Sequence, residues 1–174
     1  MSMKALLAIL LFCLPALAAD LPSPAAAACG QDDVEFDVKT SDRQATVPQP
    51  QPGKALVFVV EDFDRPEGEL ITPTARVGLD GAWVGANRGR AYLFFPVDPG
   101  KHHLCSDWQS VPSSVQLQAS LASLTAEAGR TYYFRTRILE HSGGVWTLDL
   151  ERVDDDEGQL LVATSPLSGY RPKK

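Results

Sequence analysis

The chain has 174 residues, with 16 lysine and arginine residues against 22 aspartate and glutamate residues, which gives a net charge of -6 at pH 7. A surface of that sign repels phosphate backbones and anionic lipid headgroups, so it argues against a nucleic-acid partner. The length is sufficient for one hydrophobic core of ordinary size. We therefore expect a single domain that does not bind nucleic acid.

Residues 1–18 have the three regions of a secretory signal peptide. Lys4 precedes a short apolar run at residues 5–14, and Ala16-Leu17-Ala18 supplies the small residues that a signal peptidase needs. The run is too short to span a bilayer and no later run approaches that length, so we expect no transmembrane segment. Cleavage after Ala18 or Ala19 would leave about 155 residues with a net charge of about -7. The pattern predicts an exported bacterial protein, either periplasmic or extracellular.

The three cysteines restrict the covalent structure. Cys13 lies in the signal peptide, so the mature chain keeps Cys29 and Cys105, and two cysteines in an exported protein have one intramolecular pairing. We predict a disulfide between them that closes a loop of about 76 residues. Lipid modification of Cys29 is the less favoured alternative, because a lipidated cysteine usually follows directly on the apolar region of the signal.

Residues 19–52 are predicted to form a leader and a proline-rich connector with one short strand. Residues 20–28 are rich in proline and alanine and have no periodicity, which is typical of a flexible leader. Residues 34–38 alternate apolar and polar side chains, as a strand does. The prolines of residues 47–53 remove hydrogen-bond donors and bar a helix, which predicts an extended connector.

Residues 53–164 are predicted to form a single β domain. Residues 55–60 are a continuous apolar run and are the best candidate for a central buried strand. Asp80-Gly81 separates two strand-like runs and is a strong hairpin signal. Strands are expected at residues 74–79, 83–85, 91–97, 101–108, 121–126, 131–139 and 146–150.

The last of these segments define the fold class. Tyr132 and Phe134 share one face of their strand while Tyr133 and Arg135 share the other, which predicts a sheet with one solvated face. Asp154 with Glu157 fits a helix-capping pair. Residues 110–118 are expected to loop out, and residues 165–174 to form a frayed tail. The pattern predicts an antiparallel β-sandwich or small open barrel of about eight strands with one short C-terminal helix.

Three segments carry a family resemblance: Leu-Asp-Gly-Ala-Trp-Val-Gly at residues 79–85, Asp-Pro-Gly-Lys-His at 98–102 and Ala-Glu-Ala-Gly-Arg-Thr-Tyr-Tyr-Phe at 126–134. Over residues 53–162 the chain resembles the bacterial envelope family named domain of unknown function 2846, and more loosely the PEGA modules. The resemblance implies export and a β-sandwich-like fold. It brings no catalytic residue, because the shared positions are turn glycines and core aromatics. The cysteine pair departs from many members of that family.

No metal site or cofactor is predicted. His102 and His103 are adjacent on a strand, so they point to opposite faces and cannot chelate one ion together. His103 shares a face with Cys105 and Asp107, but Cys105 is expected in the disulfide. The acidic run at residues 154–157 lacks the ligand spacing of a calcium loop.

No catalytic residue is predicted either. Ser106 and Ser110 lack the sequence context of an activated nucleophile. A cluster of carboxylates that could serve as a pair in glycoside cleavage is formed by Glu61, Asp62 and Asp64. Their position indicates the polar end of a strand instead.

Four side chains are the candidates for contact with a partner: Trp83, Arg88, Tyr133 and Arg135. An exposed aromatic ring can stack on a sugar or anchor a protein. Trp83 follows the Asp-Gly turn near a hairpin tip, where burial is hardest to arrange. Trp108 and Tyr92 are further aromatic candidates, and Trp146 is expected in the core.

We predict a noncatalytic, monomeric, exported interaction domain that binds a protein partner or a polysaccharide of the cell envelope. The alternative is a small hydrolase or metal-dependent enzyme of unrecognised type. A deep polar pocket with convergent histidine, aspartate or serine would favour the enzyme, whereas a flat face with exposed aromatics would favour the interaction domain.

Overall fold

The apolar run after the proline-rich connector forms strand β2 (Ala55–Glu61), in which every residue is buried. The computed structural model describes residues 28–41, 46–63, 72–110, 116–142 and 145–174. Side chains alternate along β2, so Val57 and Val59 face one hydrophobic core while Leu56 and Phe58 face another. Burial on both faces explains why this strand is apolar throughout, as the sequence predicted.

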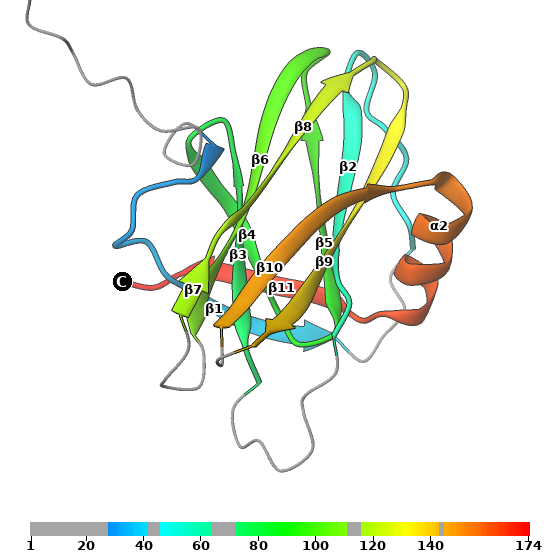
Figure 1. Cartoon of the computed structure of the whole chain (residues 1–174). Coiled ribbons are helices and arrows are strands. Elements are labelled where there is room, and N and C mark those ends of the chain that lie inside the picture. Colours follow the sequence, from blue (N-terminus) through cyan, green and yellow to red (C-terminus); the bar gives the residue numbers. More distant parts are fainter. Residues whose placement is uncertain (1–27, 42–45, 64–71, 111–115, 143–144) are drawn as a thin grey trace, which may run out of the picture.

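The strands form two sheets (Figure 1). The seven-stranded sheet has the order β1-β11-β5-β2-β9-β10-β7, and the four-stranded sheet has the order β4-β3-β6-β8. The first sheet adds to β2 the strands β1 (Phe36–Ser41), β11 (Leu167–Pro172), β5 (Ala91–Val97), β9 (Thr131–His141), β10 (Val145–Val153) and β7 (Gln116–Gln118). The second contains β4 (Ala82–Arg88), β3 (Thr74–Leu79), β6 (Gly100–Ser110) and β8 (Ser120–Ala126).

The fold class is confirmed as a β-sandwich. Leu104 and Leu124 of the smaller sheet pack against Val57 and Phe134 of the larger one, and the two sheets do not join into a closed barrel over the described residues. Most neighbouring strands are antiparallel, but β9 pairs with β2 in parallel, as do β7 with β10 and β11 with β5. A parallel pair needs a long crossover, and here the chain between β2 and β9 builds the whole second sheet.

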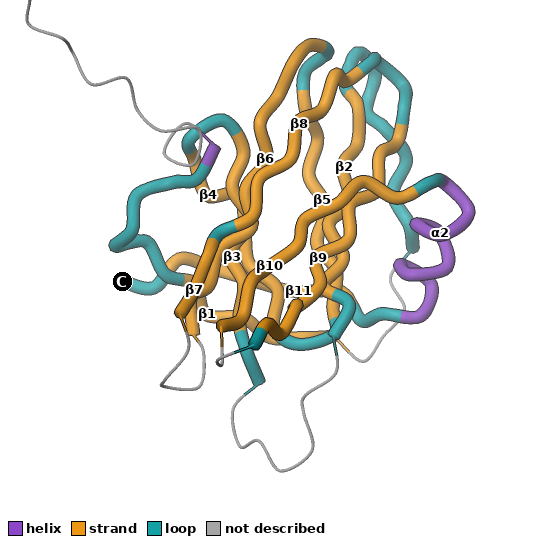
Figure 2. Tube along the Cα trace, viewed as in Figure 1, coloured by secondary structure: helices purple, strands orange, loops and turns teal. Residues whose placement is uncertain are grey.

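The predicted C-terminal helix is present as α2 (Asp155–Thr164). Its N-cap is Asp154, whose carboxylate accepts a hydrogen bond of 2.8 Å from the backbone N–H of Glu157. Leu161 and Val162 of α2 pack against the outer core of the larger sheet. Figure 2 shows α2 outside that sheet, on the opposite side of the molecule from β4.

The C-terminal segment does not form the frayed tail that the sequence predicted. It forms β11, which pairs along its whole length with β1 and is held by ion pairs from Arg171 to Asp37 and from Lys173 to Glu35. Pro172 lies at a position whose N–H the ladder does not need, so the proline does not stop the strand. The pairing partner is more than a hundred residues away in the chain, so no local pattern announces this strand.

The stretch at residues 110–118 is also more regular than the predicted loop. Its first residue, Ser110, ends β6, and Gln116–Gln118 forms β7 beside β10. Residues 111–115 lie outside the described part of the chain.

The predicted disulfide joins Cys29 to Cys105, with 5.2 Å between the two Cα atoms. It uses the Cys29 sulfur that lipid modification would need. The signal peptide at residues 1–18 lies outside the described residues. Among the residues that are described, no helix has the length and apolar character needed to cross a membrane.

Candidate functional site

A cavity of about 630 Å³ lies between the proline-rich connector, the turn before β9 and α2. We call it the α2 cavity. Its lining residues are Val47, Pro48, Gln49, Gly129, Arg130, Thr131, Tyr133, Asp155, Gln159, Val162 and Ala163. This volume lies within the range of small-ligand sites in proteins.

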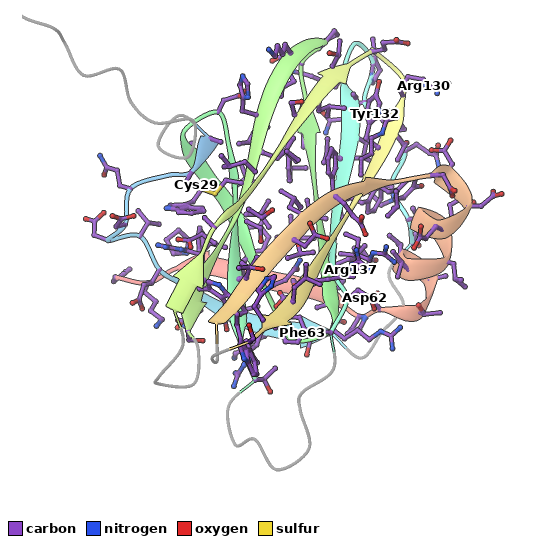
Figure 3. All side chains as sticks on the ribbon, in the orientation of Figure 1. Cys29, Asp62, Phe63, Arg130, Tyr132 and Arg137 are labelled. Atoms are coloured by element: carbon purple, nitrogen blue, oxygen red, sulfur yellow. A yellow bond between two sulfur atoms is a disulfide. The ribbon has the colours of Figure 1, made fainter. Side chains whose placement is uncertain are left out.

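Local sequence features build each wall of the α2 cavity. The connector cannot form a helix because of its prolines, so it passes the sheet as an extended segment. Gly129, with φ of +77°, makes the turn that starts β9. Figure 3 shows Arg130 at this turn, at the end of the sheet where α2 begins. The ring of Tyr133 stacks on Phe58, with 5.3 Å between the ring centroids.

Tyr133 lines this cavity and carries a hydroxyl group. The residue is 6% exposed, and no hydrogen-bond partner for its hydroxyl exists among the described residues. Burial raises the pKa of this hydroxyl, and the Asp155 carboxylate raises it further. The group therefore stays protonated at neutral pH and can donate as well as accept a hydrogen bond.

The polar side chains around Tyr133 are also unengaged. Arg130, Asp155, Gln49 and Gln159 form no side-chain hydrogen bond or ion pair with any residue in the described ranges. The lining of the cavity therefore offers one cation, one anion, two amides and the hydroxyl of Tyr133, together with apolar side chains. None of these four residues was predicted, because the three chain segments that form the cavity are distant in sequence.

Gly158 sits where α2 meets Tyr133, and a β-carbon at this position would lie 2.1 Å from Tyr133 Cγ. Replacing an exposed glycine inside a helix by alanine usually raises the free energy of unfolding by about 1 kcal/mol. Here the overlap forces α2 or the ring to move, so we expect Gly158→Ala to lower the free energy of unfolding by about 2 kcal/mol. Urea denaturation measures the free energy of unfolding. The control is Leu160→Ala, at an exposed position of α2. An unchanged or higher stability of Gly158→Ala would mean that α2 does not dock on Tyr133.

Arg135, predicted to contact a partner, lies beside Tyr133 under α2. Its guanidinium forms ion pairs with Glu151 of β10 and Glu157 of α2. The hydrogen bond to Glu151 is the main cause of its raised pKa. Arg135 therefore fastens α2 to the sheet, and its donors are engaged within the chain.

Trp83 and Arg88 lie on β4, in the other sheet, so the structure does not bring the four predicted residues together. Trp83 is half-buried, and its indole N–H donates a 2.6 Å hydrogen bond to the Gln31 carbonyl. The guanidinium of Arg76 lies 4.3 Å from the centre of the Trp83 ring. These contacts hold the segment around Cys29 in place, which is why the ring is covered although it lies near a hairpin tip.

Arg88 is exposed and lines a second hollow of about 610 Å³, which we call the β1 groove. Its lining residues are Glu35, Phe36, Asp37, Val38, Lys39, Thr72, Thr74, Arg88, Gln109, Ser110 and Lys173. The groove runs along β1, the edge strand of the larger sheet, and shares no residue with the α2 cavity.

Within the described residues, the histidines do not belong to any group of three or more side chains that could hold a metal ion. His102 has both ring nitrogens engaged, Nδ1 with Asp80 Oδ2 at 2.6 Å and Nε2 with the Asp98 carbonyl at 2.8 Å. Partial burial lowers the pKa of His102, but the hydrogen bonds to these two acceptors outweigh it and the pKa is raised. His141 Nε2 lies 2.9 Å from Thr147 Oγ1, on the exposed surface.

The other candidates for catalysis are occupied or buried. Asp107 forms an ion pair of 2.7 Å with Arg76, and Ser106 is fully buried. Asp64 lies outside the described residues. Glu61 is not a polar strand end as predicted, because it is completely buried and neither carboxyl oxygen has a hydrogen-bond partner among the described residues.

No protein-family model, curated protein or solved structure matches this chain. Function is therefore inferred from the chemistry of the α2 cavity and the β1 groove themselves.

Proposed function

We propose that this protein is a noncatalytic, exported binding domain that holds a segment of a neutral cell-envelope polysaccharide in the α2 cavity. The observation that carries the proposal is the hydroxyl of Tyr133, which has no hydrogen-bond partner among the described residues and belongs to a residue that lines a cavity of about 630 Å³. A hydroxyl without a partner in the chain is free to donate a hydrogen bond to a ligand and to accept one from it. The disulfide supports export, because such bonds persist in oxidising compartments.

The polar groups of the α2 cavity match a ligand rich in hydroxyl groups. A sugar hydroxyl both donates and accepts, and the unengaged side chains of Arg130, Asp155, Gln49 and Gln159 offer both functions. The single cation and single anion balance, which favours a neutral ligand. The Tyr133 ring face is covered by Phe58, so its hydroxyl and not its face makes the contact.

The same cavity gives less support to a glycosidase. Such enzymes use a pair of carboxyl groups on either side of the scissile bond. Asp155 is the single carboxylate among the residues that line the α2 cavity. A small hydrolase or metal-dependent enzyme remains the alternative prediction, and the resemblance to the domain of unknown function 2846 family remains a prediction as well.

Two adjacent tyrosines provide the test. We expect Tyr133→Phe to weaken saccharide binding about tenfold while leaving stability unchanged, because it removes a hydroxyl that has no partner within the described chain. Tyr132→Phe is the matched control. The Tyr132 hydroxyl accepts a 3.0 Å hydrogen bond from the Glu127 N–H, so its loss should cost about 1 kcal/mol of stability without affecting binding.

Binding is measured by calorimetry with tetrasaccharides of N-acetylglucosamine, mannose and glucose as probes. Saturable binding of at least one probe, weakened by Tyr133→Phe alone, supports the proposal. Absence of binding by all three, or equal binding by both variants, contradicts it, and hydrolysis of a probe would favour the enzyme. Export is checked by mass spectrometry of the protein purified from its native host. The intact mass should be that of a chain that begins at Ala19 or Asp20.

A further inference from the structure

We propose that the β1 groove is a docking site for an extended, acidic peptide segment of another protein, which binds by adding a strand to the outer edge of β1. This site is separate from the α2 cavity and goes beyond the proposed polysaccharide binding. Strand addition at a sheet edge is a recurring mode of peptide recognition, in which the backbone hydrogen bonds give affinity and the side-chain contacts give specificity.

The pairing of β1 with β11 determines which of its backbone groups face outward. The Lys173 N–H donates to the Glu35 carbonyl at 2.8 Å, so residues 35, 37 and 39 are the ones that exchange hydrogen bonds with β11. The backbone groups of Phe36, Val38 and Thr40 consequently point away from β11, toward the free edge. Val38 is half-buried and lines the groove.

Gln109 already makes the first contact that an added strand would make. Its side-chain amide donates to the Phe36 carbonyl at 2.8 Å and accepts from the Phe36 N–H at 2.7 Å. These are the two hydrogen bonds of a residue in an antiparallel strand, so the outer edge accepts an amide group in peptide geometry. The next outward groups, on Val38 and Thr40, have no hydrogen-bond partner in the described part of the chain.

The charges of the β1 groove favour an acidic peptide. Glu35 and Asp37 are neutralised by Lys173 at 2.6 Å and Arg171 at 3.1 Å. The cations of Lys39 and Arg88 form no ion pair with any described residue. The groove therefore carries unbalanced positive charge on a chain whose net charge is -6, and an arginine pairs well with a carboxylate.

A second copy of this chain is a poorer fit to the edge. The register that would place Val38 against Val38 of a second copy also requires Thr40 to pair with Phe36, whose backbone Gln109 already occupies. The next register places Lys39 opposite Lys39 of the second copy, and like charges directly opposite each other are destabilising. Gln109 and Lys39 therefore disfavour the pairing of β1 with a second copy of the chain. The outward backbone groups of Val38 and Thr40 remain without a partner among the described residues.

The test uses a fluorescein-labelled heptapeptide of alternating threonine and valine with a central glutamate, and the same peptide with a central lysine. We expect the glutamate peptide to bind the full chain saturably in fluorescence anisotropy, and at least tenfold more tightly than the lysine peptide. Val38→Pro should reduce its affinity at least tenfold, since it removes an outward N–H that β11 does not use. Val38→Ala keeps the N–H and should bind like the wild type.

Two further measurements keep the outcome decisive. Arg88→Gln should bring the glutamate peptide down to the affinity of the lysine peptide, and the backbone amide signals of Val38 and Thr40 should shift on binding of the glutamate peptide. The proposal is overturned if neither peptide binds at millimolar concentration, if Val38→Pro folds and binds normally, or if both peptides bind equally. If the wild type forms concentration-dependent dimers that Val38→Pro abolishes, the occupant of the β1 edge is a second copy of this chain and the peptide proposal is overturned.

Discussion

We expect the wild-type protein to lose stability as the pH rises above about 5, and we expect Glu61→Gln not to show this loss. Glu61 is 0% exposed, and neither of its carboxyl oxygens has a partner among the described residues. It follows Val57 and Val59 on the face of β2 that packs between the sheets, and it pairs in register with the buried Thr136. Burial raises the pKa of Glu61 well above its ordinary value of 4.5.

The direction of the pH effect follows from proton binding. Above pH 4.5 the unfolded chain loses the Glu61 proton while the folded protein retains it. The folded state then binds more protons than the unfolded state, so stability falls with rising pH until the folded pKa is reached. The slope from this one group is about 1.4 kcal/mol per pH unit. Carboxylates with lowered pKa values, such as Glu35 and Asp80, act in the opposite direction and at more acidic pH.

Urea denaturation of wild type and Glu61→Gln at half-unit intervals from pH 5 to 8 isolates this contribution, because the other groups cancel in the difference. Glu61→Leu is a second variant without a titratable or polar group, and we expect it to be about 1 to 3 kcal/mol more stable than wild type at pH 8. A constant difference between wild type and Glu61→Gln across this range would show that the buried carboxyl does not titrate as inferred.

Much of the fold could be predicted from local patterns. The apolar run of β2, the Asp80-Gly81 hairpin and the Asp154 cap each depend on residues close together in sequence, and each prediction was confirmed. The disulfide was predictable because the mature chain was expected to have one possible pair. Strand β11 was not predictable, since its partner β1 lies more than a hundred residues away.

The burial of Glu61 shows how a correct pattern can be misread at its end. The alternation of β2 places residue 61 on the inward face with residues 55, 57 and 59, so the periodicity contained the information. A glutamate at the end of an apolar run nevertheless reads as the start of a loop, because fully buried carboxylates without partners are uncommon. The alternation of side chains along β2 therefore predicts the burial of Glu61, whereas the polar character of this residue does not.

The candidate sites were less predictable than the fold. Tyr133 was selected for a solvated sheet face, but α2 covers that face, and the hydroxyl is useful because it opens into the cavity beneath the helix. The sequence predicts that Arg135 and Trp83 contact a partner, but both are engaged within the chain. Arg88 alone remains exposed as predicted. Tertiary contacts decide such outcomes, and a single sequence does not display them.

Removing the disulfide is expected to have the largest effect on stability. In the chain-entropy model, a cross-link between residues 76 apart contributes about 4 kcal/mol by restricting the unfolded chain. We expect the double variant Cys29→Ala, Cys105→Ala to lose about this amount of unfolding free energy in urea. Reduced wild type is the matched control, because it breaks the bond without removing the buried Cys105 side chain.

The native position of the N-terminal segment should survive this loss. Arg76, which is 6% exposed, donates 3.0 Å hydrogen bonds to the carbonyls of Asp32 and Val34, and Trp83 holds the carbonyl of Gln31. Hydrogen exchange of residues 31–34 under native conditions should therefore change little in the double variant while global stability falls. A stability loss below about 1 kcal/mol would contradict the chain-entropy estimate. Loss of protection confined to residues 31–34 would mean that the covalent bond, and not Arg76, positions this segment in the folded protein.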